Sequence, residues 1–429
     1  MLNPSLSLSS VFSVISVVNF MSDFTLSKPA DDREMSRFLD ICSLALHFPR
    51  DMADRFAAIT GREAFRVVRS STNGNPIVGG LAIHDMGQFF GGKSLRMGGI
   101  GAVGIAPEFR ASGAATQMMT LVLRDMRDSG FLISSLYPAT VPLYRRAGYE
   151  VAGSRYEITI PIRQMRLEKR SGDAHRIDRI AEADRQRIVE FYTAAARHTP
   201  GLLDRREFSW KRVYEPRGDK AQGYKVLNAA GTIEGYAFLL QKDSPHVHAQ
   251  APLFQLLVND VQFATPAAGM RLLELIRQHQ SVCDTAILYG SPDHPLLALI
   301  PERTFTARHQ FHWMLRILDV RKALEGRGWN ACVRGEVALD VRDDVLAENN
   351  AKMALSVDGG AVKVKNGGAG DAIIDIRGLA ALYTGHLSPQ DLLSWGRLQI
   401  ADHVRDPQRV LETLAAMFAG PRPWLGDMF

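Results

Sequence analysis

A short loop directly before a helix is the first feature of this sequence that could do chemistry. A predicted strand ends at Ile105, and the residues Arg110-Ala111-Ser112-Gly113-Ala114-Ala115 lead into the helix. The first amides of a helix have no partner within it, and the helix dipole places positive charge there, so such a loop can bind an anion. Gly113 allows close backbone approach, and Arg110 can add charge-assisted hydrogen bonds. The spacing predicts a phosphate site, and the loop itself lacks the G-x-G-x-x-G pattern of a dinucleotide loop.

A tyrosine-containing segment follows the next predicted strand. It reads Tyr137-Pro138-Ala139-Thr140-Val141-Pro142-Leu143-Tyr144-Arg145-Arg146-Ala147-Gly148-Tyr149-Glu150. A neutral phenol, whose ordinary pKa is about 10, can donate a proton to a leaving group at neutral pH. Tyr144 is therefore the candidate general acid. Packing beneath a turn is the alternative interpretation, and we expect it for Tyr149.

Hydrophobic periodicity predicts the elements that must position these residues. In the first part of the chain we expect helices over residues 31–47, 114–128 and 142–146, and strands over 65–69, 76–84, 94–105, 131–136 and 149–160. In the second part we expect helices over 182–197 and 267–279, and strands over 224–228, 233–241, 254–263, 285–289 and 311–317. The similar order of elements suggests a diverged duplication. The last part predicts strands over 335–342, 351–357, 360–365 and 372–375, then helices over 376–384, 389–396 and 407–419.

The 429 residues are too many for one hydrophobic core, so we expect several domains. The predicted fold class is α/β in two related domains, at 21–162 and 163–320, followed by a small α+β domain at 321–429. Residues 1–20 contain an apolar run without a preceding Lys or Arg, too short to span a membrane. We interpret them as a disordered extension, or as the product of a start codon upstream of Met21.

Composition excludes several classes of function. The formal net charge of +5 comes from dispersed basic residues, without the aromatic interleaving typical of nucleic-acid modules, so neither a nucleic acid nor a membrane is expected as a partner. The three cysteines lie far apart and form no CxxC pair, which argues against disulfides and fits a reducing cytoplasm. The histidines show no spacing typical of a metal site, so no metal is expected.

The loop spacing R-x-x-G-x-A after a strand resembles the acyl-CoA loop of the GNAT superfamily of N-acetyltransferases, and the segment around Tyr144 resembles the close of GNAT domains. This resemblance implies acetyl-CoA as co-substrate, with its pantetheine arm held by the amides of Val103 and Ile105 and its pyrophosphate held by the amides of 113–115. The implied contact residues are Val103, Gly104, Ile105, Arg110, Ala111, Ser112, Gly113, Ala114, Ala115, Ala139 and Thr140.

The whole arrangement resembles the Eis (enhanced intracellular survival) N-acetyltransferases. It consists of one complete GNAT domain, a second that lacks the loop, and a small C-terminal domain that ends in an aromatic residue. The resemblance implies a sterol carrier protein-like third domain, a hexamer, and direct acetyl transfer in a ternary complex to a polyamine-like, aminoglycoside-like or lysine substrate. It also implies two catalytic groups, Tyr144 and the terminal carboxylate of Phe429.

Two departures from the family pattern limit this expectation. Many Eis proteins have R-R-R-G in the loop, whereas here Ala111 and Ser112 follow Arg110, so two cationic contacts are missing. Ala139 and Thr140 stand where some members have Ser-Glu. A cationic substrate would need an acidic pocket, for which the candidates are Asp40, Asp85, Glu150 and Asp427. The alternatives are a lipid- or small-molecule-binding protein with a vestigial acyltransferase domain, and an acyltransferase for longer acyl-CoAs.

Overall fold

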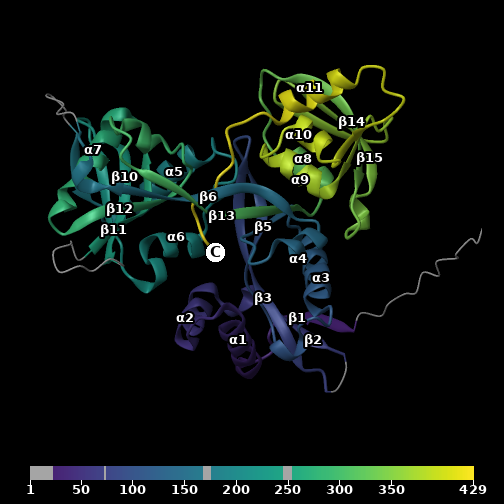
Figure 1. Cartoon of the computed structure of the whole chain (residues 1–429), viewed down its shortest axis with the longest axis horizontal. Coiled ribbons are helices and arrows are strands. Elements are labelled where there is room, and N and C mark those ends of the chain that lie inside the picture. The colour runs from purple at the N-terminus through teal and green to yellow at the C-terminus, as the bar shows by residue number, and fades with distance from the viewer. Residues whose placement is uncertain (1–22, 72–73, 168–174, 245–253) are drawn as a thin grey trace, which may run out of the picture.

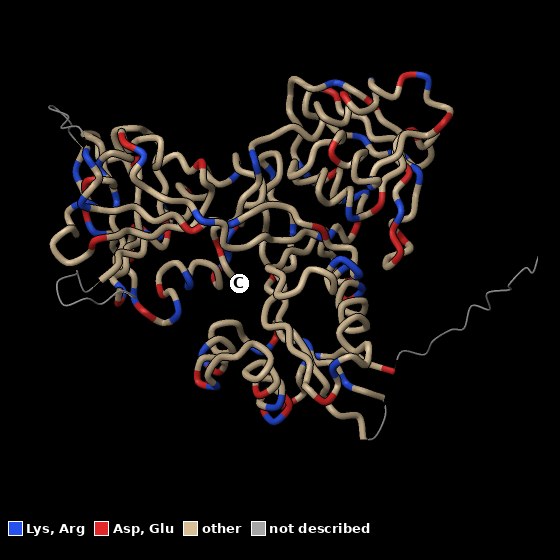
Figure 2. The backbone as a smooth tube through the Cα atoms, in the orientation of Figure 1, with Lys and Arg blue, Asp and Glu red and all other residues tan. Residues whose placement is uncertain are grey.

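The computed structural model describes residues 23–71, 74–167, 175–244 and 254–429, and the predicted extension over 1–20 lies outside these residues. Figure 1 shows three lobes, and the C-terminus lies at the centre, where they meet. Figure 2 shows basic and acidic residues interspersed over all three lobes, as expected for a mildly basic surface. No helix in the described part of the chain is long and apolar enough to cross a membrane.

The first lobe contains the loop and the tyrosines identified above. Its elements are β1 (Phe24–Ser27), α1 (Asp32–Leu46), α2 (Arg50–Thr60), β2 (Phe65–Ser70), β3 (Ile77–Phe90), β4 (Lys93–Ile105), α3 (Ala114–Asp128), β5 (Ile133–Leu136), α4 (Val141–Arg146) and β6 (Glu150–Pro161). The predicted bounds of α3 are confirmed, because one face of this helix is buried through Met118, Met119, Val122, Leu123 and Met126. α2 was not predicted, since Ala53 is its only buried residue and its apolar pattern is weak.

The second lobe repeats this order. It contains β7 (Arg176–Arg179), α5 (Arg185–Ala196), β8 (Leu203–Asp204), α6 (Glu207–Tyr214), β9 (Gln222–Leu227), β10 (Ile233–Asp243), β11 (Phe254–Phe263), α7 (Pro266–Arg277), β12 (Cys283–Gly290) and β13 (Thr306–Ile317). In both lobes an antiparallel pair, β3–β4 or β10–β11, leads through a helix to a parallel neighbour, β5 or β12. The repeated topology matches the duplication inferred from the sequence.

One mixed sheet runs through both lobes. Its main path has the order β1-β2-β3-β4-β5-β13-β6-β12-β11-β10-β9-β7. β13, the last strand of the second lobe, therefore lies between β5 and β6 of the first, and β6 pairs with β12 of the second lobe. The two lobes thus exchange strands, and the sheet continues across the boundary predicted after residue 162.

The third lobe is a separate α+β unit. It consists of α8 (Val320–Gly326), β14 (Arg334–Arg342), β15 (Ala351–Asp358), β16 (Ala361–Asn366), β17 (Ala372–Asp375), α9 (Ile376–Thr384), α10 (Pro389–Ser394), β18 (Leu398–Ile400) and α11 (Pro407–Phe418). Its sheet has the order β16-β15-β14-β17-β18. α9 packs on β6 and β13, and the fully buried Arg316 of β13 donates two hydrogen bonds to Asp343, at 2.7 and 2.8 Å. After α11 the chain returns to the centre of the molecule (Figure 1).

Candidate active site

An opening between β4 and β5 lies beside the predicted loop. The two parallel strands pair from Met97 to Ile100 on β4, where Ile100 faces Leu136, the last residue of β5. β4 then continues to Ile105 without this neighbour. Since β4, α3 and β5 follow one another in a right-handed crossover, the start of α3 lies at the same end of the sheet as this opening. An extended ligand can therefore replace β5 along the free edge of β4.

A bulge in β4 marks the same place. The register between β3 and β4 shifts between Gly80 and Ala82, and Ala102 on β4 has a left-handed φ of 52°. The carbonyl of Ala102 accepts a hydrogen bond from Cys42 Sγ of α1, at 3.3 Å. A bulge re-aims the backbone and ends regular pairing. Val103, Gly104 and Ile105, which were predicted to contact acetyl-CoA, lie directly after it.

The start of α3 has free backbone amides, as an anion site requires. Within the described residues, no hydrogen bond engages the amides of Gly113 and Ala115, and the Arg110 side chain is exposed without an ionic partner. Ala111 and Gly113 both have left-handed φ values, of 63° and 85°, and a Cβ at Gly113 would meet nothing within 4 Å. The Ser112 hydroxyl donates to the carbonyl of Phe109 at 2.7 Å. The loop is therefore open to a phosphate group.

In the second lobe, the start of the corresponding helix, α7, is capped by a side chain. The Thr265 hydroxyl caps α7 by accepting a hydrogen bond from the amide of Ala268, at 3.2 Å, and Pro266 follows it. A capped helix start that begins with proline has fewer free donors for a ligand. This contrast agrees with the inference that only the first domain retains the loop.

The two tyrosines have different environments. Tyr149 is fully buried and donates a hydrogen bond to Ser134 Oγ at 2.8 Å, which confirms the packing interpretation. Tyr144 lies on α4 with its ring edge against Tyr149, and no hydrogen bond within the described part of the chain engages its hydroxyl. Burial raises the pKa of Tyr144 to about 12, so the phenol is neutral and keeps its proton at physiological pH.

The last residues of the chain are anchored between the first two lobes. Tyr137, directly after β5, donates hydrogen bonds to the carbonyls of Leu425 at 3.0 Å and Asp427 at 2.8 Å. The Arg155 guanidinium on β6 donates to the carbonyl of Gly426 at 3.0 Å. Each contact joins a part of the sheet to the tail, so the sheet determines where the chain ends.

Phe429 ends at the free stretch of β4. A Cβ at Gly101 would lie 3.1 Å from its carboxyl carbon and 3.4 Å from Nε2 of His84 on β3. His84 is buried, its Nε2 has no hydrogen-bond partner among the described residues, and its ring stacks on Phe208 at 3.9 Å between centroids. Burial and the nearby Arg212 lower the pKa of His84 to about 3, so this imidazole is neutral. The glycine in β4 thus leaves room for the carboxylate and the imidazole.

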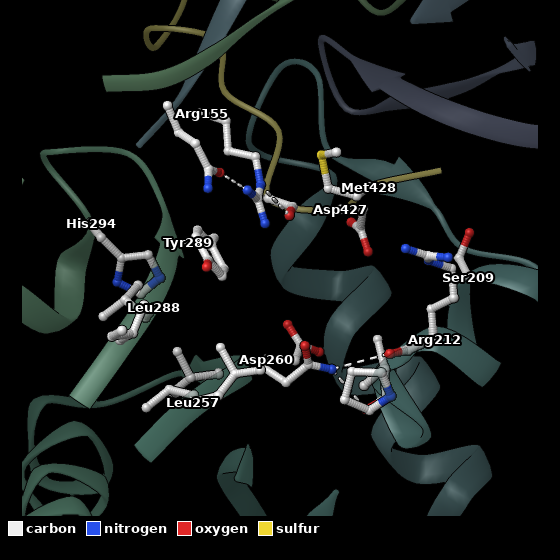
Figure 3. A pocket seen from close by; sticks show the side chains of 18 of the residues that line it. Arg155, Ser209, Arg212, Leu257, Asp260, Leu288, Tyr289, His294, Asp427 and Met428 are labelled. Atoms are coloured by element: carbon white, nitrogen blue, oxygen red, sulfur yellow. Dashed lines mark hydrogen bonds between the residues drawn. The ribbon is translucent and has the colours of Figure 1, made fainter. Parts of the chain in front are cut away.

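A cavity of about 430 Å³ extends from the tail into the second lobe (Figure 3). Five of its lining side chains are basic: Arg155, Arg205, Arg212, Arg217 and Lys242. Two are acidic, Asp260 and Asp427. Arg205 binds both of these carboxylates, with distances of 2.6 Å to Asp260 and 2.9 Å to Asp427. The charged lining of the cavity therefore carries a surplus of positive charge.

The acidic residues that were candidates for an amine pocket are paired with arginines, and most of them lie outside the cavity. Asp40 pairs with Arg50, Asp85 pairs with Arg96 and Arg206, and Glu150 pairs with Arg145 and Arg377. None of these three lines the cavity, and Asp427, which does, is bound by Arg205. Ala139 and Thr140 are exposed before α4 and lie outside this cavity as well.

Comparison with known proteins identifies the family. Residues 27–152 and 201–317 match two models of the acetyltransferase (GNAT) domain, and residues 320–426 match the sterol carrier protein domain. The solved structure of a GCN5-related N-acetyltransferase from Anabaena variabilis is 32% identical, with a TM-score of 0.85, over 95% of this chain and 100% of that one. The chain belongs to the GCN5-related N-acetyltransferase family. It is therefore an acetyltransferase, and family members use acetyl-CoA as co-substrate.

Two curated relatives extend this family likeness along the whole chain. An uncharacterized N-acetyltransferase of Streptomyces griseus is 27% identical over 94% of this chain and 98% of its own length. The N-acetyltransferase Eis of Mycobacterium tuberculosis is 26% identical over 93% of this chain and 98% of its own length. The Eis-like order of two GNAT domains and a sterol carrier protein domain is confirmed, and it favours an enzyme over the lipid-binding alternative.

Several residues of the site were not predicted from the sequence. Tyr137 could have been suspected, because it follows a predicted strand and begins the tyrosine segment. The sequence did not indicate that three arginines, Arg155, Arg205 and Arg212, would line a cavity. Their positions depend on the exchange of strands between the lobes and on α6, which was not predicted. The position of His84 beside Phe429 comes only from the fold.

Proposed function

We propose that this GNAT enzyme transfers acetyl directly from acetyl-CoA to a primary amine of a small molecule. Acetyl-CoA supplies an activated thioester. The observation that carries the proposal is the convergence of three features: the free edge of β4, the uncapped start of α3, and the carboxylate of Phe429 beside Gly101. A donor that lies along β4 meets all three.

The start of α3 and β4 would hold the co-substrate. Gly113 and Ala115 offer free amides to the pyrophosphate, and Arg110 is free to add charge. Val103 and Ile105 follow the bulge on the edge that β5 leaves unpaired, which suits hydrogen bonding to the pantetheine arm in the manner of a neighbouring strand. Ala111 and Ser112 leave Arg110 as the single cation of the loop, so this arginine is expected to matter for affinity.

Tyr144 is the proposed general acid. Its hydroxyl is neutral, has no competing hydrogen bond in the described structure, and lies on α4, directly after the strand that leaves β4. Proton donation from this hydroxyl to the departing sulfur would neutralise the thiolate of CoA as the C–S bond breaks. Tyr149 cannot replace it, because the Tyr149 hydroxyl donates to Ser134.

The carboxylate of Phe429 is the proposed proton acceptor. An amine must lose a proton before or during its attack on the thioester. The carboxylate of Phe429 lies beside Gly101, at the stretch of β4 that β5 leaves unpaired. The hydrogen bonds from Tyr137 and Arg155 to the tail would hold it in place. Positioning of both reactants in one site is expected to supply much of the acceleration.

Two measurements test this function. Acetyl-CoA should raise the midpoint of thermal unfolding, because a ligand that binds only the folded state stabilises it. Release of free thiol from acetyl-CoA should then depend on an added primary amine, without a burst of thiol release in its absence. No stabilisation by acetyl-CoA, or thiol release that is independent of amine, would contradict direct transfer in a ternary complex.

Assembly and location belong to the same proposal. The likeness to Eis suggests a hexamer, which light scattering after size-exclusion chromatography would measure. Cys42 and Cys283 are buried and unpaired, and Cys332 is exposed and unpaired, which suits a reducing compartment such as the cytoplasm.

A further inference from the structure

The cavity beside the tail has a polarity that bears on the amine substrate. A polycationic amine would enter a space lined by Arg155, Arg212 and Arg217, and none of these forms an ion pair among the described residues. Bringing further positive charge there is unfavourable, because like charges repel, and most strongly beside the buried Arg155. The lining therefore selects against polyamines and in favour of a ligand with negative charge.

Arg212 is the group that a negative charge would meet. It lies on α6, lines the cavity, and no hydrogen bond or ion pair of its guanidinium occurs in the described structure. Burial and the neighbouring Arg217 lower the pKa of Arg212, while Asp427 acts in the opposite direction. A planar guanidinium with free donors binds a carboxylate or a phosphate through two parallel hydrogen bonds.

α6 connects this guanidinium to the place of transfer. The Arg212 guanidinium lies over the Phe208 ring at 5.7 Å, and Phe208 stacks on His84, which lies beside the ring of Phe429. At the tail side of the cavity, Asp427 Oδ1 accepts from Arg205, while Asp427 Oδ2 is buried without a hydrogen-bond partner among the described residues. The Asp427 carboxylate of the tail and the unpaired Arg212 guanidinium of α6 therefore line the same cavity (Figure 3).

We propose that the amine substrate carries an acidic group, a carboxylate or a phosphate, and that Arg212 binds this group while the amine faces the tail. The inference rests on the proposed function, and it replaces a polyamine with an amphoteric small molecule as the substrate class. Arg155 adds positive charge to the same lining, where its guanidinium contacts the Gly426 carbonyl, Gln310 and the Tyr289 ring.

A matched set of amines tests the acidic group. The set is 4-aminobutanoate, 4-aminobutanamide and 1,4-diaminobutane, with 3-aminopropylphosphonate as the phosphate-like arm and shorter and longer chains of each type. The kcat/KM, measured by thiol release from acetyl-CoA, should be at least about tenfold higher for 4-aminobutanoate than for 4-aminobutanamide. It should be lowest for 1,4-diaminobutane. Comparison of the carboxylate and phosphonate arms identifies the acid. Equal or faster turnover of the amide or diamine series would overturn the inference.

Substitution of Arg212 tests the residue. Arg212→Gln should reduce the preference for acid over amide about tenfold or more, through KM, and Arg212→Lys should have an intermediate effect because charge remains without the planar fork. Lys211→Gln is the matched control, since this exposed neighbour on α6 loses the same charge outside the cavity. An unchanged preference in a folded Arg212→Gln protein would remove Arg212 from this role.

A binding measurement separates failure of this inference from failure of the proposed function. With CoA present, 4-acetamidobutanoate should raise the unfolding midpoint of the wild type more than 4-acetamidobutanamide does, and Arg212→Gln should abolish the difference. If no amine releases thiol but this difference is found, the transfer function fails and the anion site stands. If amines are acetylated but acid and amide bind equally, the function stands and the anion site fails.

Discussion

The carboxyl carbon of Phe429 lies directly over Gly101, where a Cβ would approach it to 3.1 Å. This relationship predicts that Gly101→Val displaces the terminal carboxylate and lowers kcat by about 100-fold, a loss typical of an acid–base group. The Kd for acetyl-CoA should change little. Gly326→Ala is a suitable control, because its Cβ would meet only side-chain atoms at 3.5 Å or more. Full activity of a folded Gly101→Val protein would contradict the proposed position of the carboxylate.

Chemical change of the tail tests the carboxylate without altering β4. A C-terminal carboxamide on Phe429 keeps the shape of the tail and removes its charge, so turnover should fall about 100-fold while the unfolding midpoint stays nearly constant. A peptide tag after Phe429 should have the same effect on turnover, and the same tag at the N-terminus should not. An active carboxamide enzyme would show that Phe429 contributes packing alone.

The paired tyrosines allow a comparison of two similar substitutions. Tyr144→Phe should lower kcat by about 100-fold or more, because the proposed proton donor is lost, with acetyl-CoA binding nearly unchanged. Tyr149→Phe should retain turnover and lose about 1 kcal/mol of folding free energy, since a buried hydrogen bond to Ser134 is removed. Steady-state kinetics and thermal unfolding of both variants measure this contrast. If Tyr149→Phe lost turnover while Tyr144→Phe kept it, Tyr144 would be excluded as the general acid.

Arg110 should contribute strongly to the affinity for acetyl-CoA, because it is the single cation of the loop. Arg110→Gln is predicted to raise the Kd by about tenfold, in line with loss of a charge-assisted hydrogen bond. Arg124→Gln, which removes an exposed charge farther along α3, should leave the Kd unchanged. Calorimetric titration with CoA measures both. Equal effects of the two variants would indicate a general influence of charge rather than a contact.

The buried pair of Arg316 and Asp343 should be important for stability. Asp343 also accepts hydrogen bonds from Asn349 and from the amides of Val345 and Leu346, at 2.8 to 3.1 Å. Asp343→Ala leaves a buried guanidinium without its partner and should cost about 3–5 kcal/mol in the free energy of unfolding. Denaturant titration measures the loss. The double variant Arg316→Met, Asp343→Leu should recover part of it, and no recovery would point to the loop amides as the main cost.

Local patterns in the sequence predicted most of the elements, and tertiary contacts decided the rest. The predicted bounds of α3 and α9 are confirmed. α3 has one buried face, and α9, which is buried on nearly every side, begins at the Asp375 cap and ends at Gly385. β3 extends beyond its predicted end, through Asp85, Gly87 and Gln88, since pairing with β4 and β8 outweighs the low strand propensity of these residues. The position of β13 between β5 and β6 has no local signal. The sequence of a strand does not show whether its neighbours belong to its own lobe or to the other one.

The loop and Tyr144 could be proposed from residue type and spacing, because both belong to contiguous segments. The cavity was not, since it joins β6, α6, β11 and the tail. Charge alone suggested Asp40, Asp85 and Glu150 as acidic candidates, yet each lies beside an arginine that only folding brings near. The polarity of a pocket depends on which charges are paired, and pairing is a property of the fold.

The position of β13 has a consequence for synthesis and for evolution. The sheet of the first lobe cannot be completed until the ribosome has made residue 317, because β13 fills the position between β5 and β6. A gene fragment that ends after β6 would therefore encode an open sheet with two exposed edges rather than a small enzyme. Loss of either lobe would leave the other with an incomplete sheet, so the two lobes can be kept or lost only together.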